Sequence, residues 1–281
     1  MPSMRAAGAG DARRRAEPIG PTGPARERRP DVAGWLRKKW RQHPRAGALA
    51  DRLDACTRFP PCGSGACPVC CEEFQHDFAP AARGFLEEHR RGATVVCVGL
   101  ALPGLAVPPG GLTGMNLPAA KRRIQARLDR AGVGWALGAW DLSMNEHRTA
   151  RYAPFWLPHL HLLTEAWDPE ALQRRLKRSS PGTDAVPRPV KVQPWDGRGN
   201  ALLYPLKMKF DRRVGVDDAE RFSPKTGRWR RCRATSHQRL RSAERFELLL
   251  HLDEIGLGGR LFLRGAQLRR TRGGMKIVAM P

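Results

Sequence analysis

Two histidines, His159 and His161, lie one residue apart in the apolar segment FWLPHLHLLTEA, which spans residues 155–166. The segment predicts a β-strand, and residues two apart on a strand face the same side. Both imidazoles should therefore project from one face, while the neighbouring leucines project from the other. Imidazole is a common ligand of divalent metals, so the pair could supply two ligands. A single histidine on an apolar strand is more often structural, so the metal interpretation depends on the surroundings of the pair.

A carboxylate on the preceding segment can complete this ligand set. The segment WALGAWDLSMN, residues 135–145, alternates apolar and polar residues and predicts another strand. Asp141 lies on its polar face. If the two strands pair as an antiparallel hairpin, Asp141, His159 and His161 could bind one divalent cation with positions open for substrate and water.

One of the two tyrosines of the chain, Tyr204, lies further on in the segment LLYPLKMKF, with Lys207 three positions after it. We predict that residues 200–213 form a helix, on which this spacing brings the ammonium close to the phenol. A phenol has a pKa of about 10. Attack on phosphorus as a phenolate therefore needs positive charge nearby. The metal ion that polarises the phosphate and the ammonium of Lys207 could supply it.

The motif HLH followed by YxxK in a basic chain resembles the HUH endonucleases, specifically the rolling-circle replication initiators of plasmids and phages and related transposases. In that family two histidines flank one hydrophobic residue, as His159 and His161 do. A tyrosine with a lysine three or four residues later forms a further motif, as Tyr204 and Lys207 do. An acidic or amide residue on the preceding strand often completes the family's metal site, and the resemblance makes Asp141 the best match for it, with Glu146 the second choice. The resemblance covers residues 56–213. It implies nicking and joining of single-stranded DNA with Mg²⁺ or Mn²⁺, through a covalent 5′-phosphotyrosine, in rolling-circle replication or transposition.

A second cluster of candidate ligands precedes these motifs. Five of the seven cysteines lie between residues 56 and 71, and clustered cysteines in a cytoplasmic chain indicate a metal site rather than disulfides. The candidate zinc ligands are Cys56, Cys62, Cys67 and Cys70. Four thiolates close the Zn²⁺ tetrahedron, so the site should be structural. Cys71 or His76 could replace one member. A module ending in CPxC before the first core strand also occurs in many plasmid initiators, which extends the resemblance.

The elements that must position these residues follow a regular order. We expect strands at residues 94–102, 135–145, 156–164, 189–194 and 260–264, and helices at residues 71–89, 118–131, 168–177, 200–213 and 238–255. This order is that of a ferredoxin-like split βαβ sandwich, an α+β fold with an antiparallel sheet. Such a sheet would carry helices on one face and leave the other face free for a site.

The chain of 281 residues is long enough for one large domain or two small ones. We expect a disordered basic arm at residues 1–30, a helix with the zinc-binding cysteine module at 31–91, an HUH-like catalytic domain at 92–213, and a basic, helical C-terminal extension at 214–281. No apolar run approaches the roughly 20 residues of a membrane span, and the N-terminus lacks the apolar segment of a secretory signal. These features predict a cytoplasmic protein that has no membrane partner.

The charge of the chain favours nucleic acid as a partner. Fifty Lys and Arg against 27 Asp and Glu leave a net charge of +23. Repulsion between so many positive side chains destabilises a compact domain unless a polyanion binds. Aromatic residues among cations suit single-stranded DNA, which stacks its bases and presents phosphates. The candidate DNA-contacting residues are Arg212, Arg213, Trp229, Arg230 and Arg231. The resemblance implies DNA at a replication origin or transposon end, with a host helicase as a further partner.

Two other functions fit parts of the pattern. In the first, the protein is a non-catalytic, zinc-containing nucleic-acid-binding protein, and its HLH and YPLK motifs are accidental. In the second, it is a metal-independent phosphoesterase that uses paired histidines. Enzymes of that kind need two separated HxT or HxS motifs, whereas this chain has one HLH followed by leucine.

Overall fold

The computed structural model describes most of the chain. The described ranges are residues 24–57, 61–89, 92–198, 200–203, 206–223, 227–271 and 274–280. The side chains of residues 24–30, 200, 202, 218, 221, 223, 230 and 231 are outside the description. Residues 1–23 of the expected disordered arm lie outside the described residues. The first described helix begins at Pro24, inside the stretch expected as the arm, and proline suits the first turn of a helix.

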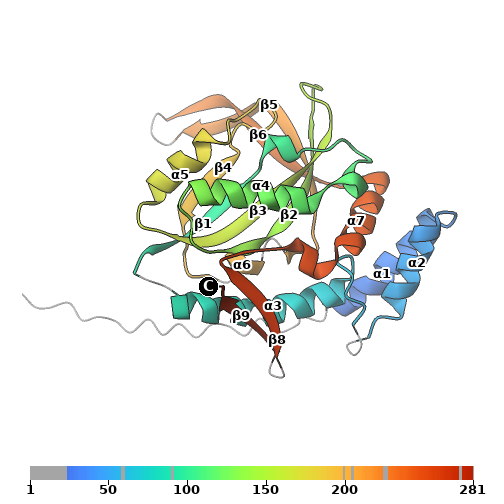
Figure 1. Cartoon of the computed structure of the whole chain (residues 1–281). Helices are drawn as coiled ribbons and strands as arrows, with labels where there is room; N and C mark the ends of the chain where they lie inside the picture. The colour runs from blue at the N-terminus through green and yellow to red at the C-terminus, as the bar shows by residue number, and fades with distance from the viewer. Residues whose placement is uncertain are drawn as a thin grey trace, which may run out of the picture.

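Three helices open the described part of the chain, and strands and helices are interspersed after them (Figure 1). The helices are α1 (Pro24–Lys39), α2 (Pro44–Asp54), α3 (Pro68–His89), α4 (Leu117–Arg130), α5 (Pro169–Arg178), α6 (Asn200–Leu203) and α7 (Ser242–Arg260). The strands are β1 (Thr94–Leu100), β2 (Ala136–His147), β3 (Phe155–Ala166), β4 (Val190–Pro194), β5 (Asp211–Ser223), β6 (Arg228–Arg239), β7 (Leu261–Arg264), β8 (Ala266–Thr271) and β9 (Gly274–Ala279). Most of the expected elements between residues 68 and 194 are present with ends that differ by a few residues.

The main sheet is curled and mostly antiparallel. Its strands run in the order β4-β1-β3-β2-β5-β6, and β7 also pairs with β2. The neighbours among β4, β1, β3 and β2 are all antiparallel. β5 runs parallel to the end of β2, whereas β7 pairs antiparallel with its start. With β8 and β9 as a separate hairpin, the protein has a mixed α+β fold.

Helices pack on both faces of the central strands. Apolar residues at every third or fourth position of α4 and α5 bury one face of β3, including Leu160 and Leu162. On the opposite face, Phe78 and Phe85 of α3 belong to the same core cluster as Leu163. The expectation that one face stays free is therefore wrong. The long apolar stripe of α3 has to be buried, and it covers part of the histidine-bearing face.

The cysteine-bearing region shares its core with the C-terminal part of the chain. Leu36 of α1, Leu53 of α2 and Cys70 of α3 lie in one apolar cluster with Leu249 of α7 and Trp156 of β3. The segment at residues 31–91 is therefore packed into the same body as the sheet. None of the described helices has both the length and the apolar character that a membrane crossing requires.

Two expected helical regions have a different structure. The helix expected at residues 200–213 ends at Leu203, and β5 begins at Asp211. Proline lacks an amide hydrogen and disfavours helix at the residue before it, so Pro205 explains this early end. The expected helical tail is present only in part. α7 and β7 match the helix and the short strand expected at residues 238–255 and 260–264, but β5 and β6 form a long antiparallel hairpin before them. Val214 and Val216 are buried at alternate positions of β5, as in a strand with one face on the core.

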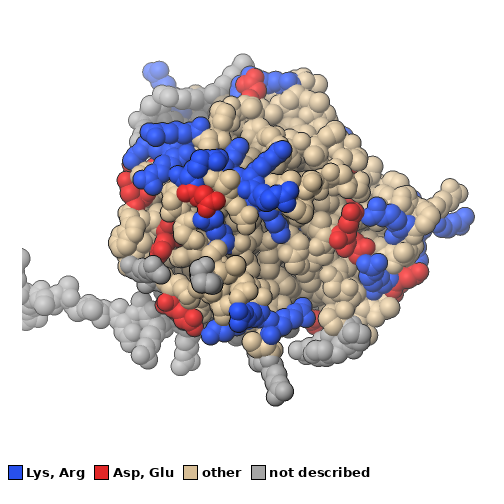
Figure 2. Space-filling view, in the orientation of Figure 1, with Lys and Arg blue, Asp and Glu red and all other residues tan. Residues whose placement is uncertain are grey.

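The charge of the protein is visible on its surface. Figure 2 shows that Lys and Arg side chains gather over the part of the molecule occupied by α4 and α5 in Figure 1. These two helices lie on the Leu160 face of the sheet, opposite the histidines.

Candidate functional site

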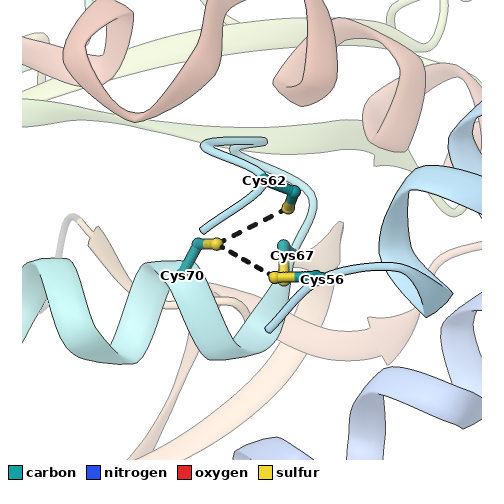
Figure 3. A group of neighbouring side chains, drawn as sticks. All are labelled: Cys56, Cys62, Cys67 and Cys70. Atoms are coloured by element: carbon teal, nitrogen blue, oxygen red, sulfur yellow. Dashed lines mark hydrogen bonds between the residues drawn. The ribbon is translucent and has the colours of Figure 1, made fainter. Parts of the chain in front are cut away.

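Four cysteines from separate turns of the chain form a compact cluster (Figure 3). The cluster consists of Cys56 after α2, Cys62 in the following loop, Cys67 directly before α3 and Cys70 in its first turn. Their sulfur atoms all lie within 4.8 Å of one another. Among the described residues, this is the one group of three or more potential ligands that meets that distance.

The sulfur separations fit tetrahedral zinc. The Sγ of Cys70 lies 3.5 Å from the Sγ of Cys56 and 3.5 Å from that of Cys62, and the Sγ atoms of Cys56 and Cys67 are 3.7 Å apart. A tetrahedron with Zn–S bonds of about 2.3 Å has S···S edges of about 3.8 Å. The cluster could therefore hold a metal such as zinc with little rearrangement.

The chemistry of the thiols also suits a metal. Hydrogen bonds from Cys67 and Cys70 lower the pKa of Cys62, whereas the hydrogen bonds with Cys62 and Cys70 raise the pKa of Cys67, so Cys62 loses its proton more readily than Cys67. Thiolates are the metal-binding form of cysteine. The two alternative ligands lie outside the cluster. Cys71 donates its thiol hydrogen to the Gly65 carbonyl over 3.4 Å, and His76 is exposed beside Asp77.

The histidine pair lies on the predicted hairpin. β2 and β3 pair antiparallel, with Asp141 directly opposite His159 and Ala139 opposite His161. The two imidazole rings have centroids 6.5 Å apart. Leu160 lies in the core cluster of α4 and α5 on the opposite face. Two imidazoles and one carboxylate thus share the face that α3 partly covers.

The carboxylate of Asp141 is buried and already has a cationic partner. It is 1% exposed, and its Oδ1 accepts a hydrogen bond from the backbone N–H of Leu142 over 2.9 Å. Its Oδ2 lies 3.2 Å from the Nζ of Lys207. Burial of a carboxylate is costly without such a partner. The fold therefore places the positive charge of Lys207 beside Asp141. The sequence predicts Lys207 on a helix, but the residue lies after the end of α6.

Both histidines are held in the neutral form. Burial is the largest cause that lowers the pKa of His159 well below its usual range, and the charges of Arg213, His161 and Lys207 add to it. Burial also lowers the pKa of His161, with Asp141 opposing the shift. The His159 Nε2 and Ser143 Oγ are 2.6 Å apart. A neutral imidazole is the form that binds metal.

The donor types fit a divalent cation, but the side chains are not gathered around one point. The described residues include no group with His159, His161 and Asp141 whose ligand atoms all lie within 4.8 Å of one another. A cation bound there would need the Asp141 carboxylate to exchange Lys207 for the metal. Glu146, the second choice for the carboxylate, is held by Arg212 and Arg241 over 3.1 Å each.

A buried arginine that the sequence did not single out connects these features. Arg260, at the end of α7, is 1% exposed. Its Nη2 donates to the Lys207 carbonyl over 3.1 Å, and its Nη1 donates to the Leu206 carbonyl over 3.3 Å. The same Nη1 lies 3.9 Å from the Cys71 Sγ. Arg260 thus fixes the chain that carries Lys207 against α3. Its sequence context offered no signal, since it is one of 50 Lys and Arg residues.

The expected nucleophile, Tyr204, lies outside the described residues, as does Pro205. The other tyrosine, Tyr152, donates its phenolic hydrogen to the Glu146 carbonyl over 3.3 Å. Burial, with the charges of Asp217 and Glu146, raises the pKa of Tyr152. Tyr152 is therefore held as a protonated phenol, which disfavours it as an alternative nucleophile.

The expected DNA-contacting residues occupy different environments. Arg212 is 9% exposed and binds Glu146 and Gln238, so it does not present its guanidinium to solvent as expected. Arg213 is close enough to the histidines to lower their pKa values. Trp229 is 66% exposed and lies beside the half-exposed Phe222, with ring centroids 5.7 Å apart. The side chains of Arg230 and Arg231 are outside the described residues.

Buried histidines predict a stability that falls in mild acid. Burial lowers the pKa of His251 on α7, as it does for His159, so both are neutral in the folded protein. The unfolded chain binds more protons once the pH drops below the unfolded value of about 6.5, so the free energy of unfolding falls with pH there. His251→Gln should make this slope shallower by up to about 1.4 kcal/mol per pH unit between pH 6.5 and 5. Urea unfolding at several pH values measures it, and equal slopes in variant and wild type would contradict the assignment.

Compared with models of protein families, with curated proteins and with solved structures, the chain shows no significant match.

Proposed function

We propose that the protein is a metal-dependent endonuclease of the HUH type that nicks and joins single-stranded DNA. The observation that carries this proposal is the shared face of β2 and β3. It places Asp141 across from His159, with His161 two residues further on. A chain of this charge also favours DNA as the substrate. In this proposal β1, α4, β2, β3, α5 and β4 correspond to a ferredoxin-like split βαβ unit, which is consistent with the strand order β4-β1-β3-β2.

Mg²⁺ or Mn²⁺ would be held by His159, His161 and Asp141. When bound, such an ion polarises a phosphoryl oxygen and stabilises the charge that develops on it. Two neutral imidazoles and a buried carboxylate are suitable donors for it. The ammonium of Lys207, which neutralises Asp141 in the structure, would be released toward the phosphate when the cation takes its place.

The bond changes involve Tyr204. Its phenol gives up a proton to solvent, and the phenolate oxygen attacks the phosphorus of a DNA phosphodiester. The Tyr204 O–P bond forms as the P–O3′ bond breaks, and the leaving O3′ takes a proton from solvent, which leaves a free 3′-OH and a 5′-phosphotyrosine. Attack by a 3′-OH on that phosphotyrosine restores a phosphodiester and releases Tyr204, so one site nicks and joins. In the cell this reaction would act at a replication origin or transposon end, with a host helicase to separate the strands.

The proposal predicts an adduct that depends on the histidine pair. Wild-type protein mixed with Mn²⁺ and a pool of labelled single-stranded DNA should form a protein–DNA species that survives denaturation. His159→Ala or His161→Ala should lower its rate of formation by at least about 100-fold, because loss of a ligand removes several kcal/mol of charge stabilisation. Gel electrophoresis in denaturant measures the adduct.

His76→Ala serves as the matched control, because His76 is exposed on α3. This variant should form the adduct at the wild-type rate. A wild-type protein that forms no adduct across a broad sequence pool would overturn the proposal. So would histidine variants that remain folded and form as much adduct as the wild type.

The second candidate is a non-catalytic, zinc-containing nucleic-acid-binding protein. One observation favours it over the endonuclease. The sulfur atoms of the four cysteines lie at metal-binding distances from one another, whereas the ligand atoms of the histidines and Asp141 do not. The same assay separates the two functions. A non-catalytic protein would bind the labelled strand in native gels and release all of it in denaturant.

A further inference from the structure

The outer surfaces of α4 and α5 carry an unusual density of positive charge. Five of the 14 residues of α4 and four of the ten residues of α5 are Lys or Arg. The α4–α5 surface is defined here by six of its exposed cations, which are Arg122, Arg123, Arg130, Arg174, Lys177 and Arg178. Figure 2 shows this concentration of Lys and Arg on the side of the molecule formed by the two helices.

Neighbouring carboxylates compensate only part of this charge. Arg174 lies near Asp168 and Glu170, at 3.6 and 3.5 Å. Asp129, the carboxylate of α4, forms an ion pair with Arg264 at the end of β7. These pairs involve one arginine of the defined surface.

The cations are arranged so that they repel one another. Arg123, Arg127 and Arg130 are spaced by four and three residues, which places them on one side of α4. Like charges at this spacing destabilise a helix. Burial, followed by the charges of Arg130 and Arg123, lowers the pKa of Arg127, which reflects this crowding. A bound polyanion would relieve the repulsion.

The chemistry of the surface distinguishes among polyanions. Neither α4 nor α5 contains an aromatic residue. The exposed Trp167 precedes α5 and lines a hollow with Asp168 and Glu170, so the cations of the two helices have no rings interleaved among them for stacking of single-stranded bases. An anionic membrane would favour several exposed Trp, Phe or Leu side chains beside the cations, whereas Leu172 and Leu176 of α5 are buried in the core and the exposed Trp167 adjoins Asp168 and Glu170. Double-stranded DNA needs only backbone contacts and presents one charge per about 1.7 Å of its axis. The 14 residues of α4 extend about 21 Å, so they match several consecutive phosphates.

We propose that the α4–α5 surface binds the phosphate backbone of double-stranded DNA. It lies on the Leu160 face of the sheet, opposite the face of His159 and His161, so it is separate from the proposed nicking site. The inference does not depend on nicking. If both hold, the protein contacts duplex DNA on one face while single-stranded DNA reaches the other.

The experiment compares two variants of equal net charge. The first changes four cations of the surface to glutamine, at Arg122, Arg123, Lys177 and Arg178. The matched control changes four exposed cations elsewhere, at Lys38, Lys39, Arg41 and Arg83. Binding of a short labelled DNA duplex by the full chain is measured by fluorescence anisotropy without added divalent metal. One strand of that duplex, a duplex RNA and polyglutamate serve as comparison probes.

The surface variant should bind duplex DNA at least about tenfold more weakly than the wild type between about 50 and 200 mM salt. The slope of log K against log salt should fall by about 2 to 4, since each lost phosphate contact contributes about 0.9. The control should stay within about twofold of wild type. Equal losses in both variants, or no duplex binding by the wild type, would overturn the inference. Binding of polyglutamate but not duplex would overturn it in favour of an acidic protein partner. Preferential binding of duplex RNA would overturn it in favour of RNA.

This result can be separated from the proposed endonuclease activity. Tyr204→Phe should bind the duplex as the wild type does. The surface variant should still form a covalent adduct on a short single strand, because His159 and Asp141 lie on the other face.

Discussion

Tyr204→Phe is expected to abolish the covalent adduct with single-stranded DNA, with a loss of at least about 1,000-fold in its rate of formation. Phenylalanine keeps the ring but lacks the oxygen that forms the bond to phosphorus. The substitution should leave the metal ligands in place, so binding of single-stranded DNA should change by less than about threefold. Denaturing gels for the adduct and anisotropy for binding measure the two effects separately.

Tyr152→Phe is the matched control, since these are the two tyrosines of the chain. The Tyr152 hydroxyl donates to the Glu146 carbonyl, and the pKa of Tyr152 is raised, so no role in bond formation is expected. This variant should form the adduct within about threefold of the wild-type rate. An adduct that survives Tyr204→Phe and disappears with Tyr152→Phe would show that the nucleophile has been assigned to the wrong tyrosine.

Loss of a cysteine of the four-cysteine cluster should have the largest effect on stability. Cys70→Ser removes one of four potential zinc ligands at the first turn of α3, where α1, α2 and α7 share a core with the cluster. Zinc binding contributes directly to the free energy of folding. We expect the midpoint of thermal unfolding to fall by about 10 °C or more, and a chelator to have the same effect on the wild type. Thermal unfolding and a zinc content of about one ion per chain measure this.

Cys232→Ala provides the comparison, because Cys232 lies on β6 and is not a member of the cluster. It should retain its zinc and unfold within a few degrees of the wild type. Purified protein without zinc, with a melting temperature unaffected by chelator, would contradict a structural metal site.

The parts of this architecture that local sequence determines were predictable. The alternation around Asp141 and the apolar run around His159 fixed which residues share a face, because side chains alternate on every strand. The spacing of the cysteines likewise indicated their cluster, and the Asp168-Pro169 pair marked the start of α5. Its cap is present, with the Asp168 carboxylate accepting from the Ala171 N–H.

The remainder depends on contacts between distant segments. Residues 200–213 contain apolar positions that suit a helix, but Pro205 interrupts them and β5 joins the sheet instead. Arg212 is one of many arginines in sequence, and only its pairing with Glu146 of β2 makes it a buried residue. Arg260 acquires its contacts from segments more than 50 residues away. No local periodicity encodes such partners.

Mass spectrometry of the adduct tests the proposed endonuclease activity most directly. After reaction with Mn²⁺ and single-stranded DNA, the DNA is trimmed by a nuclease and the protein is cut with trypsin. Trypsin cleaves after Arg198 and Lys207 and releases the peptide GNALLYPLK. Tyr204 is the one tyrosine in this peptide. We predict that this peptide gains the mass of a phosphate-linked nucleotide on Tyr204. A nucleotide on another residue, or on no peptide at all, would contradict the proposed function.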